Sequence, residues 1–132
     1  MVFSSITHPF ALRSSVSVEE LENEPFVTRE QGSATRHNAE KEMQNSGVII
    51  NTIMELGSNE AVKRAVGAGL GLGMLSRFSL VPEVKAGMLK IITVDGLRIT
   101  RNFTTIYRKD KELTRAEKRF LEIVRESVPL VG

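Results

Sequence analysis

The chain has 132 residues, with 18 basic and 16 acidic side chains and no cysteine. This length is enough for an α/β domain with a real core, and the near balance of charge argues against a dedicated nucleic-acid binder. The lack of cysteine excludes disulfides, thiol catalysis and thiolate metal sites. The N-terminus does not match a secretory signal, and no apolar run approaches the ~20 residues that span a bilayer. We therefore expect a cytoplasmic protein without a membrane partner.

The first third of the chain contains signals for short strands and helices. We predict strands at 1–6 and 26–28 and helices at 17–22 and 34–44. Ser17 and Glu20 match a capping box, in which the glutamate three residues after the cap bonds back to it. Gly32 and Ser33 supply a turn and an N-cap for the longer helix. Its narrow apolar stripe predicts a surface helix with one edge against a sheet.

The middle of the chain contains a strand, a helix and a second strand. We predict a strand at 48–56, a helix from Ser58 or Asn59 to Gly67, and a strand at 70–75. The last of these is an apolar run without alternation, which is typical of a strand buried on both faces. The glycines at 67–73 close a helix and open a strand, which is the reverse of a dinucleotide-binding fingerprint. We interpret them as packing glycines.

The last third completes an alternating pattern of strands and helices. We predict a short helix or turn at 78–86 interrupted by Pro82, strands at 88–94 and 99–108, and a final helix at 114–126. Thr114 and Glu117 match a second capping box. Helices of ordinary length between apolar strands predict two successive parallel βαβ units, and therefore an α/β fold.

Two predicted helix starts follow predicted strands, at 32–35 and at 57–59. In parallel α/β sheets, ligands bind beyond the carboxyl ends of the strands, where helix N-termini point. Free backbone N–H groups, the positive end of the helix dipole and short polar side chains together suit a carboxylate, sulfate or phosphate. Ordinary N-capping without a ligand is the alternative interpretation.

Other chemistry has little support in the sequence. His8 and His37 fall in a turn and on a polar helix face, and the only aspartates are Asp95 and Asp110, so no catalytic set can be nominated. No histidine pair has metal-ligand spacing, and we expect neither a metal nor a cofactor. Basic residues gather from Arg98 onward. Glutamates lie among them, which favours a solvated amphipathic helix over a nucleic-acid surface.

Several strings, taken in order, resemble the effector-binding domain of LysR-type transcriptional regulators. They are HPFA at 8–11, EL at 20–21, PFVTRE at 25–30, GSATR at 32–36, SNEAVK at 58–63, VGAGLGLGMLS at 66–76 and LT at 113–114. Together they cover nearly the whole chain. The resemblance implies a fold like that of type 2 periplasmic binding proteins, with two α/β lobes, a small effector in the cleft between them and two crossover strands as a hinge.

On that template the chain begins part-way through the first lobe. The resemblance implies that residues 1–24 hold a hinge strand and the end of the first lobe, that 25–94 form the complete second lobe with a parallel-core sheet, and that 95–132 return to the first lobe through a second hinge strand and the C-terminal helix. It places effector contacts at Ser5, Gly32, Ser33, Thr35, Gly57, Ser58 and Asn59. Family members whose second-lobe loop resembles residues 29–33 often serve carbon fixation or sulfur and amino-acid metabolism. The resemblance therefore favours a small anionic effector.

The resemblance also implies the function and the partners. The chain is expected to be a non-enzymatic, ligand-sensing part of a regulator that forms homo-oligomers and meets DNA only through a winged helix-turn-helix absent from these residues. A solute-binding protein of a transport system is one alternative, and a gene remnant that neither folds nor binds is another. An incomplete first lobe would leave the strand at 99–108 unpaired and the Phe120 face uncovered, which predicts self-association or partial disorder.

Overall fold

The computed structural model describes residues 1–100 and 104–127. The chain divides into two compact units, Met1–Arg101 and Asn102–Gly132, each of which is described by itself. The strands of the first unit are β1 (Val2–Ser5), β2 (Val16–Ser17), β3 (Pro25–Arg29), β4 (Asn51–Leu56), β5 (Leu72–Met74), β6 (Leu89–Ile92) and β7 (Val94–Asp95). Its α-helices are α1 (Ala34–Asn45), α2 (Asn59–Gly67) and α3 (Arg77–Lys85), and its 3-10 turns are Pro9–Leu12 and Glu19–Leu21.

A five-stranded sheet in the order β4-β3-β5-β1-β6 forms the centre of the first unit. Strand β3 pairs in parallel with both β4 and β5, so the two predicted parallel βαβ units are confirmed. Strand β1 pairs antiparallel with β5 and β6. A second, small parallel sheet joins β2 to β7. The architecture is α/β, with a parallel core extended by antiparallel pairing on one side.

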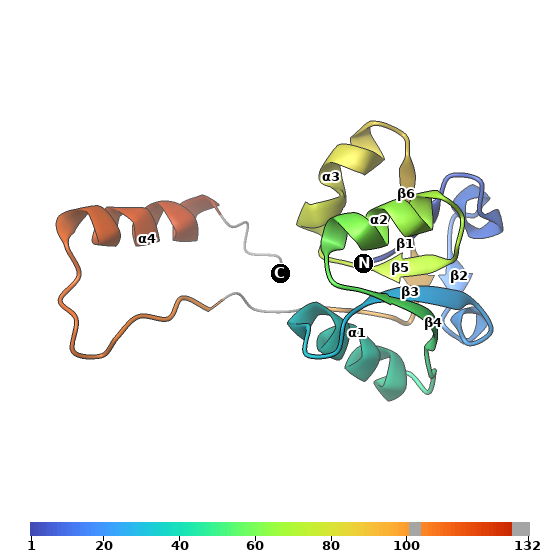
Figure 1. The fold of residues 1–132 in the computed structure, drawn as a ribbon, viewed down its shortest axis with the longest axis horizontal. Coiled ribbons are helices and arrows are strands. Elements are labelled where there is room, and N and C mark those ends of the chain that lie inside the picture. The colour runs from blue at the N-terminus through green and yellow to red at the C-terminus, as the bar shows by residue number, and fades with distance from the viewer. Residues whose placement is uncertain (101–103, 128–132) are drawn as a thin grey trace. The chain divides into compact units, whose positions relative to one another are not determined.

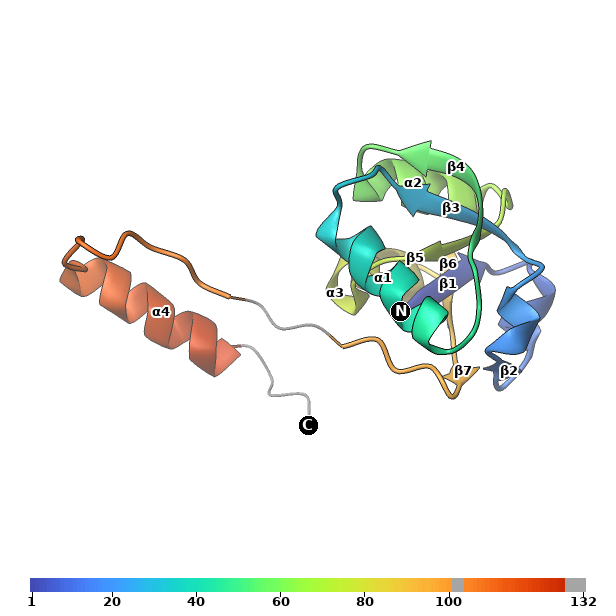
Figure 2. The same ribbon diagram turned by 90° about the horizontal axis from the view of Figure 1, so that it is seen from below.

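Helices cover both faces of the main sheet, with α1 on one face and α2 and α3 on the other (Figures 1 and 2). Alternate strand residues contribute to two separate cores, as the two-residue period of a strand requires. Phe26 packs toward the α1 side with Met43 of that helix, and Val27 packs toward the α2 side with Val62 and Val66. The central strand β5 is buried along its length, as the unalternated apolar run predicts.

Two of the glycines in the 67–73 run are required by close packing. A Cβ on Gly73 would lie 2.5 Å from the Phe3 ring and 2.9 Å from Val66 Cγ2. A Cβ on Gly71, whose φ is +156°, would lie 2.4 Å from the Pro25 carbonyl oxygen. These contacts let α2 and the neighbouring strands approach β5 closely, so the interpretation as packing glycines is confirmed at both positions.

Two predicted helices take a different form. The segment at 17–22 is a single 3-10 turn at Glu19–Leu21 with Val18 as its N-cap, and only half of the expected capping box forms, through the Ser17 amide donating to Glu20 Oε2. Pro25 follows too soon for an α-helix to extend.

The segment at 78–86 is instead one continuous helix, α3, with Pro82 inside it. Proline removes one backbone donor there, but the helix continues with Ala86 N–H donating to the Pro82 carbonyl at 2.9 Å.

Two strand predictions also differ from the structure. The strand predicted at 48–56 starts only at Asn51, because the Val48 amide donates back to the Met43 carbonyl and continues the turn after α1. The strand predicted at 99–108 is wrong at the positions that the structure describes, 99–100 and 104–108; residues 101–103 lie outside them. Residue alternation alone does not make a strand, since its backbone groups also need a neighbouring strand to bond.

The second unit contains α4 (Arg115–Ser127). Its predicted capping box is confirmed, because Glu117 N–H donates to Thr114 Oγ1 at 3.3 Å and Thr114 N–H donates to Glu117 Oε2 at 2.9 Å. A hydrogen bond from Lys111, followed by those from the Thr114 amide and hydroxyl, lowers the pKa of the Glu117 carboxyl to about 2. Within residues 1–100 and 104–127, every helix is too short or too polar to cross a bilayer.

Candidate functional site

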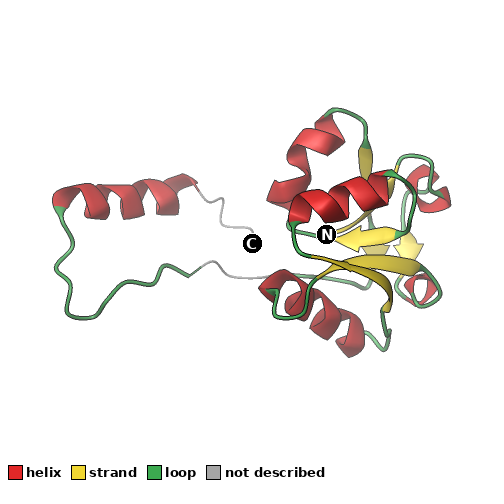
Figure 3. Ribbon diagram, viewed as in Figure 1, coloured by secondary structure: helices red, strands yellow, loops and turns green. Residues whose placement is uncertain are grey.

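The carboxyl ends of β3 and β4 bring the two predicted helix starts together. The parallel register ends at Arg29 opposite Leu56, and the Glu30 amide donates to the Leu56 carbonyl at 3.1 Å. The two loops that lead into α1 and α2 therefore start side by side, at one edge of the sheet (Figure 3). This is the edge at which parallel α/β proteins bind ligands.

Serine caps both helices at this edge, as the sequence predicts. Ser33 Oγ accepts from the Arg36 amide at 3.5 Å, and Ser58 Oγ accepts from the Ala61 amide at 3.1 Å. Gly32, with φ at +88°, makes the turn before the first cap. Each helix presents the positive end of its dipole and further first-turn N–H groups here.

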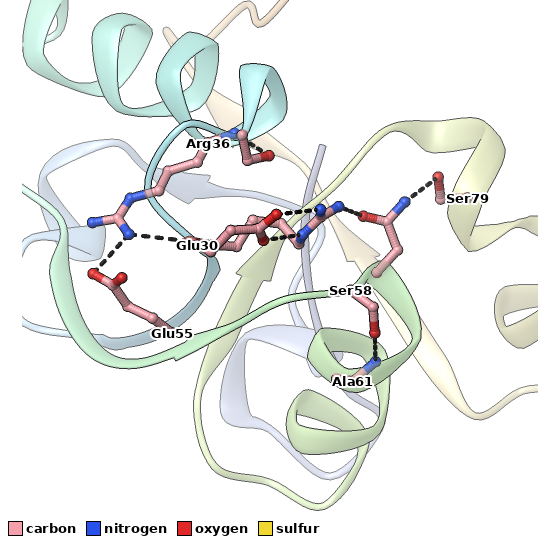
Figure 4. Close-up of polar contacts among 9 residues, drawn as sticks. Glu30, Arg36, Glu55, Ser58, Ala61 and Ser79 are labelled. Atoms are coloured by element: carbon pink, nitrogen blue, oxygen red, sulfur yellow. Dashed lines mark hydrogen bonds and ion pairs between the residues drawn. The ribbon is translucent and has the colours of Figure 1, made fainter.

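Asn59 has a different role from capping. Its Oδ1 accepts from Arg29 Nη1, and its Nδ2 donates to Ser79 Oγ at 3.4 Å. The residue thus links the end of β3 to α3 through the first turn of α2. Figure 4 shows a continuous row of polar contacts from Glu30 to Ser79, beside the cap formed by Ser58. Of the other predicted contacts, Thr35 is half-buried in the first turn of α1, and Gly57 is exposed before the second cap.

Ser5 does not join this group. Strand β1 runs antiparallel to β5, with Val2 opposite Met74 at the carboxyl end of β5, so Ser5 lies toward the opposite edge of the sheet. Ser5 pairs with Leu89, and its Oγ lies 3.1 Å from Thr7 Oγ1. The resemblance places an effector contact at Ser5 because it lies near a hinge strand, and that contact stays a prediction; Ser5 is not among the residues gathered at the two helix starts.

Two arginines at this edge were not predicted as site residues. Arg29 Nε and Nη2 donate to both carboxylate oxygens of Glu30, at 2.7 and 2.8 Å. Arg36 binds Glu40 at 2.6 Å and Glu55 at 2.7 Å and also donates to the Arg29 carbonyl at 3.1 Å. These hydrogen bonds raise the pKa of both guanidinium groups, so both are cationic. The signal in the sequence is an arginine at the end of a strand and another in the first turn of the next helix.

A surface hollow of about 410 Å³ lies at the start of α1. It is lined by Gln31, Gly32, Ser33, Ala34, Arg36, His37 and Glu40. The cations near it are compensated by the protein's own carboxylates, so an anion bound at this edge must compete with them. Among the described residues, no three His, Asp or Glu side chains gather as a metal site.

Thr28 adds an unusual feature next to Arg29. Its side chain is buried, and its Oγ1 is one of two buried side-chain oxygen atoms that lack a hydrogen-bond partner in the described part of the chain. Leaving a buried hydroxyl unpaired costs about 1–3 kcal/mol. Such groups are rare in native structures and call for an explanation.

Comparison with known proteins identifies the family. The family model described as "LysR substrate binding domain" matches residues 1–129. The chain belongs to this family. Because the match covers almost all of the chain, the resemblance inferred from its sequence strings is confirmed, and both helix starts described above lie within the substrate-binding domain.

The curated relatives of this LysR substrate-binding domain are transcriptional regulators. The chain is 38% identical over 122 residues to the HTH-type transcriptional activator CmpR of Synechocystis sp. (strain ATCC 27184 / PCC 6803 / Kazusa), covering 92% of the chain and 40% of that protein. It is also 38% identical over 122 residues, with the same coverage, to the RuBisCO operon transcriptional regulator of Acidithiobacillus ferrooxidans. The chain thus spans about 40% of the length of these relatives.

Solved structures of LysR regulators share the fold. The regulatory domain of CcmR from Synechocystis PCC6803, in complex with 2-PG, has a TM-score of 0.81 at 30% identity, and the match covers 98% of this chain and 62% of that one. HinK of Pseudomonas aeruginosa, at 22% identity, has a TM-score of 0.79 over 95% of this chain and 43% of its own. The predicted likeness to type 2 periplasmic binding proteins is thereby confirmed for the LysR substrate-binding domain.

Proposed function

We propose that this chain is the ligand-sensing part of a LysR-type transcriptional regulator, and that it binds a small anionic effector where α1 and α2 begin. The observation that carries the proposal is the convergence of two serine-capped helix N-termini at the carboxyl ends of β3 and β4. Backbone N–H groups and helix dipoles at such ends favour carboxylate and phosphate groups. The 2-PG complex of the CcmR regulatory domain supports this class of ligand.

The proposed effector site comprises Gly32, Ser33, Thr35, Gly57, Ser58 and Asn59, with Arg29 added from the structure. In this proposal, residues 25–94 belong to the second lobe of the regulator, and the stretches at 1–24 and 95–132 connect to the first lobe. Closure of the two lobes on the effector would change the arrangement of subunits, and so the grip of DNA-binding domains outside these residues. The chain would act by binding rather than catalysis, in the cytoplasm, as a homo-oligomer.

Removing both cap hydroxyls, with Ser33→Ala and Ser58→Ala, tests the proposal. We expect the affinity for 2-PG to fall about tenfold, which corresponds to the loss of about 1.4 kcal/mol of binding free energy. Each missing cap also costs about 1 kcal/mol of stability, which a folded domain tolerates. Calorimetric titration of the 132-residue chain with 2-PG measures the affinity.

Ser46→Ala is the matched control for this pair of substitutions. Ser46 lies at the opposite end of α1, where its hydroxyl donates to the Glu42 carbonyl at 3.0 Å. We expect its replacement to leave the affinity for 2-PG unchanged. Equal affinities in the double variant and the unsubstituted chain would remove the helix starts from the proposed effector site.

A further inference from the structure

The guanidinium of Arg29 is anchored from two sides. Two of its nitrogens bind the Glu30 carboxylate, and the third, Nη1, donates to Asn59 Oδ1. Asn59 is itself held by Ser79 of α3. Contacts to α2 and α3 therefore hold the guanidinium of Arg29 in place, even when the Glu30 carboxylate turns away from it.

Glu30 is the more exposed partner of this ion pair. Its side chain is 45% exposed, whereas that of Arg29 is 19% exposed. Hydrogen bonds from Arg29 lower the pKa of Glu30, so its carboxylate is ionised at neutral pH. Glu30 begins the loop before Gly32, and its carboxylate is already partly hydrated. It can therefore turn to solvent when another anion takes its two bonds on Arg29.

An incoming anion would use the same donors that Glu30 occupies. A carboxylate or phosphate binds arginine best through two parallel N–H bonds, and Glu30 already makes that pair of bonds with Nε and Nη2. Replacement of one carboxylate by another anion keeps the charge of Arg29 compensated throughout. The exchange leaves the bond from Nη1 to Asn59 intact.

We propose that Arg29 is the cationic anchor of the effector, and that Glu30 is a built-in competitor that occupies this anchor until an anion displaces it. The proposal rests on the proposed function, because it assigns residues within the same site. It also gives the site a threshold, since an anion must bind Arg29 better than the neighbouring carboxylate does. Weakly held anions are thereby excluded.

Single and double substitutions of the pair test this proposal. With Glu30→Gln we expect the affinity for 2-PG and for inorganic phosphate to rise about three- to tenfold, because the competing charge is gone. With Arg29→Gln we expect a loss of about tenfold or more. In the double variant the gain from Glu30→Gln should vanish, because no anchor remains for which Glu30 competes. The Nε–Hε resonance of Arg29, followed by NMR during the titration, reports directly on the exchange of partner.

Glu20→Gln is the matched control, since it removes the same charge from a carboxylate that pairs with Arg13 through two hydrogen bonds and does not line the hollow at the start of α1. An equal gain in affinity with Glu20→Gln, or a gain from Glu30→Gln that persists without Arg29, would show a general charge effect and overturn the proposal. If the unsubstituted chain binds 2-PG at the helix starts and Glu30→Gln changes nothing, the proposed function stands and the competitor role falls. If neither the unsubstituted chain nor the Glu30→Gln variant binds either anion, both fall.

Discussion

Lys63 is the one charged residue that is buried in the described part of the chain. Its ammonium binds Glu83 of α3 and Glu60 of its own helix, each at 2.6 Å. Burial alone would lower the pKa of Lys63, but these two hydrogen bonds outweigh it and raise the pKa. The hydrogen bond from Lys63 lowers the pKa of Glu83 in turn. The ion pair between Lys63 and Glu83 links α2 to α3.

Glu83→Gln tests the contribution of this pair to stability. We expect a loss of about 1–3 kcal/mol at pH 7, because a buried ammonium loses its better shielded partner. The folded-state pKa of Glu83 lies below the ordinary value of 4.5 for a glutamate, so its contribution is full above that value and is lost as pH falls through the folded-state pKa. Urea unfolding at pH 7 and at lower pH should show the difference from the unsubstituted chain shrinking toward acid.

Glu60→Gln is the control, since the Glu60 side chain is 70% exposed and binds the same lysine. We expect a much smaller loss there. A difference between Glu83→Gln and the unsubstituted chain that does not depend on pH would contradict this assignment.

Residue-level prediction from the sequence succeeds for three of the four predicted caps, Ser17 being the exception, and does not find the ion pairs. Ser33, Ser58 and Thr114 are found as caps because a cap bonds only to a backbone amide three residues away. The bond between Arg29 and Asn59 joins residues 30 positions apart. It depends on strand register and helix placement, which no local pattern specifies.

At the scale of elements, α2 packs closely on β5 because Gly73 has no side chain. We expect Gly73→Ala to destabilise the fold by about 1–3 kcal/mol, since the added methyl group overlaps the Phe3 ring and Val66. The control is Gly67→Ala in α2, where the nearest atom, Leu89 Cδ2, lies at an ordinary 3.7 Å. That change should be neutral or stabilising by up to about 1 kcal/mol, because alanine favours helix. Urea midpoints compare the two, and equal effects would contradict the packing role of Gly73.

The elements themselves were predicted best where helix and strand signals agreed with tertiary packing. Strands β3, β4 and β5 and helices α1 and α2 follow the expected order, because caps, glycine stops and apolar runs all indicate the same boundaries. The segment at 99–108 has the residue alternation of a strand, but it lacks a pairing partner at its described positions. Strand pairing depends on residues outside the segment, so the alternation of its own residues could not show that this segment is not a strand.

At the scale of the whole molecule, α4 carries apolar side chains that its own unit leaves uncovered. Phe120 is 64% exposed and Ile123 is 45% exposed, and both lie on its apolar side. An amphipathic helix of this kind normally buries that face. We expect the isolated 132-residue chain to self-associate through it.

Phe120→Glu should shift the isolated chain toward monomer, because a charge placed on the apolar face opposes its burial. Sedimentation velocity over a range of concentrations measures the association. Lys118→Glu introduces the same residue away from the apolar side of α4 and should change the association much less. A chain that is monomeric at every concentration before any substitution would contradict the expected self-association.

Amide NMR titration of the 132-residue chain with 2-PG shows whether a small anion binds where α1 and α2 begin. We expect saturable shifts of the amides in the first turns of both helices, at 33–36 and 58–61, with smaller changes at the opposite ends of these helices. Binding that leaves these amides unmoved, or that shifts only residues elsewhere, would contradict the proposed effector site.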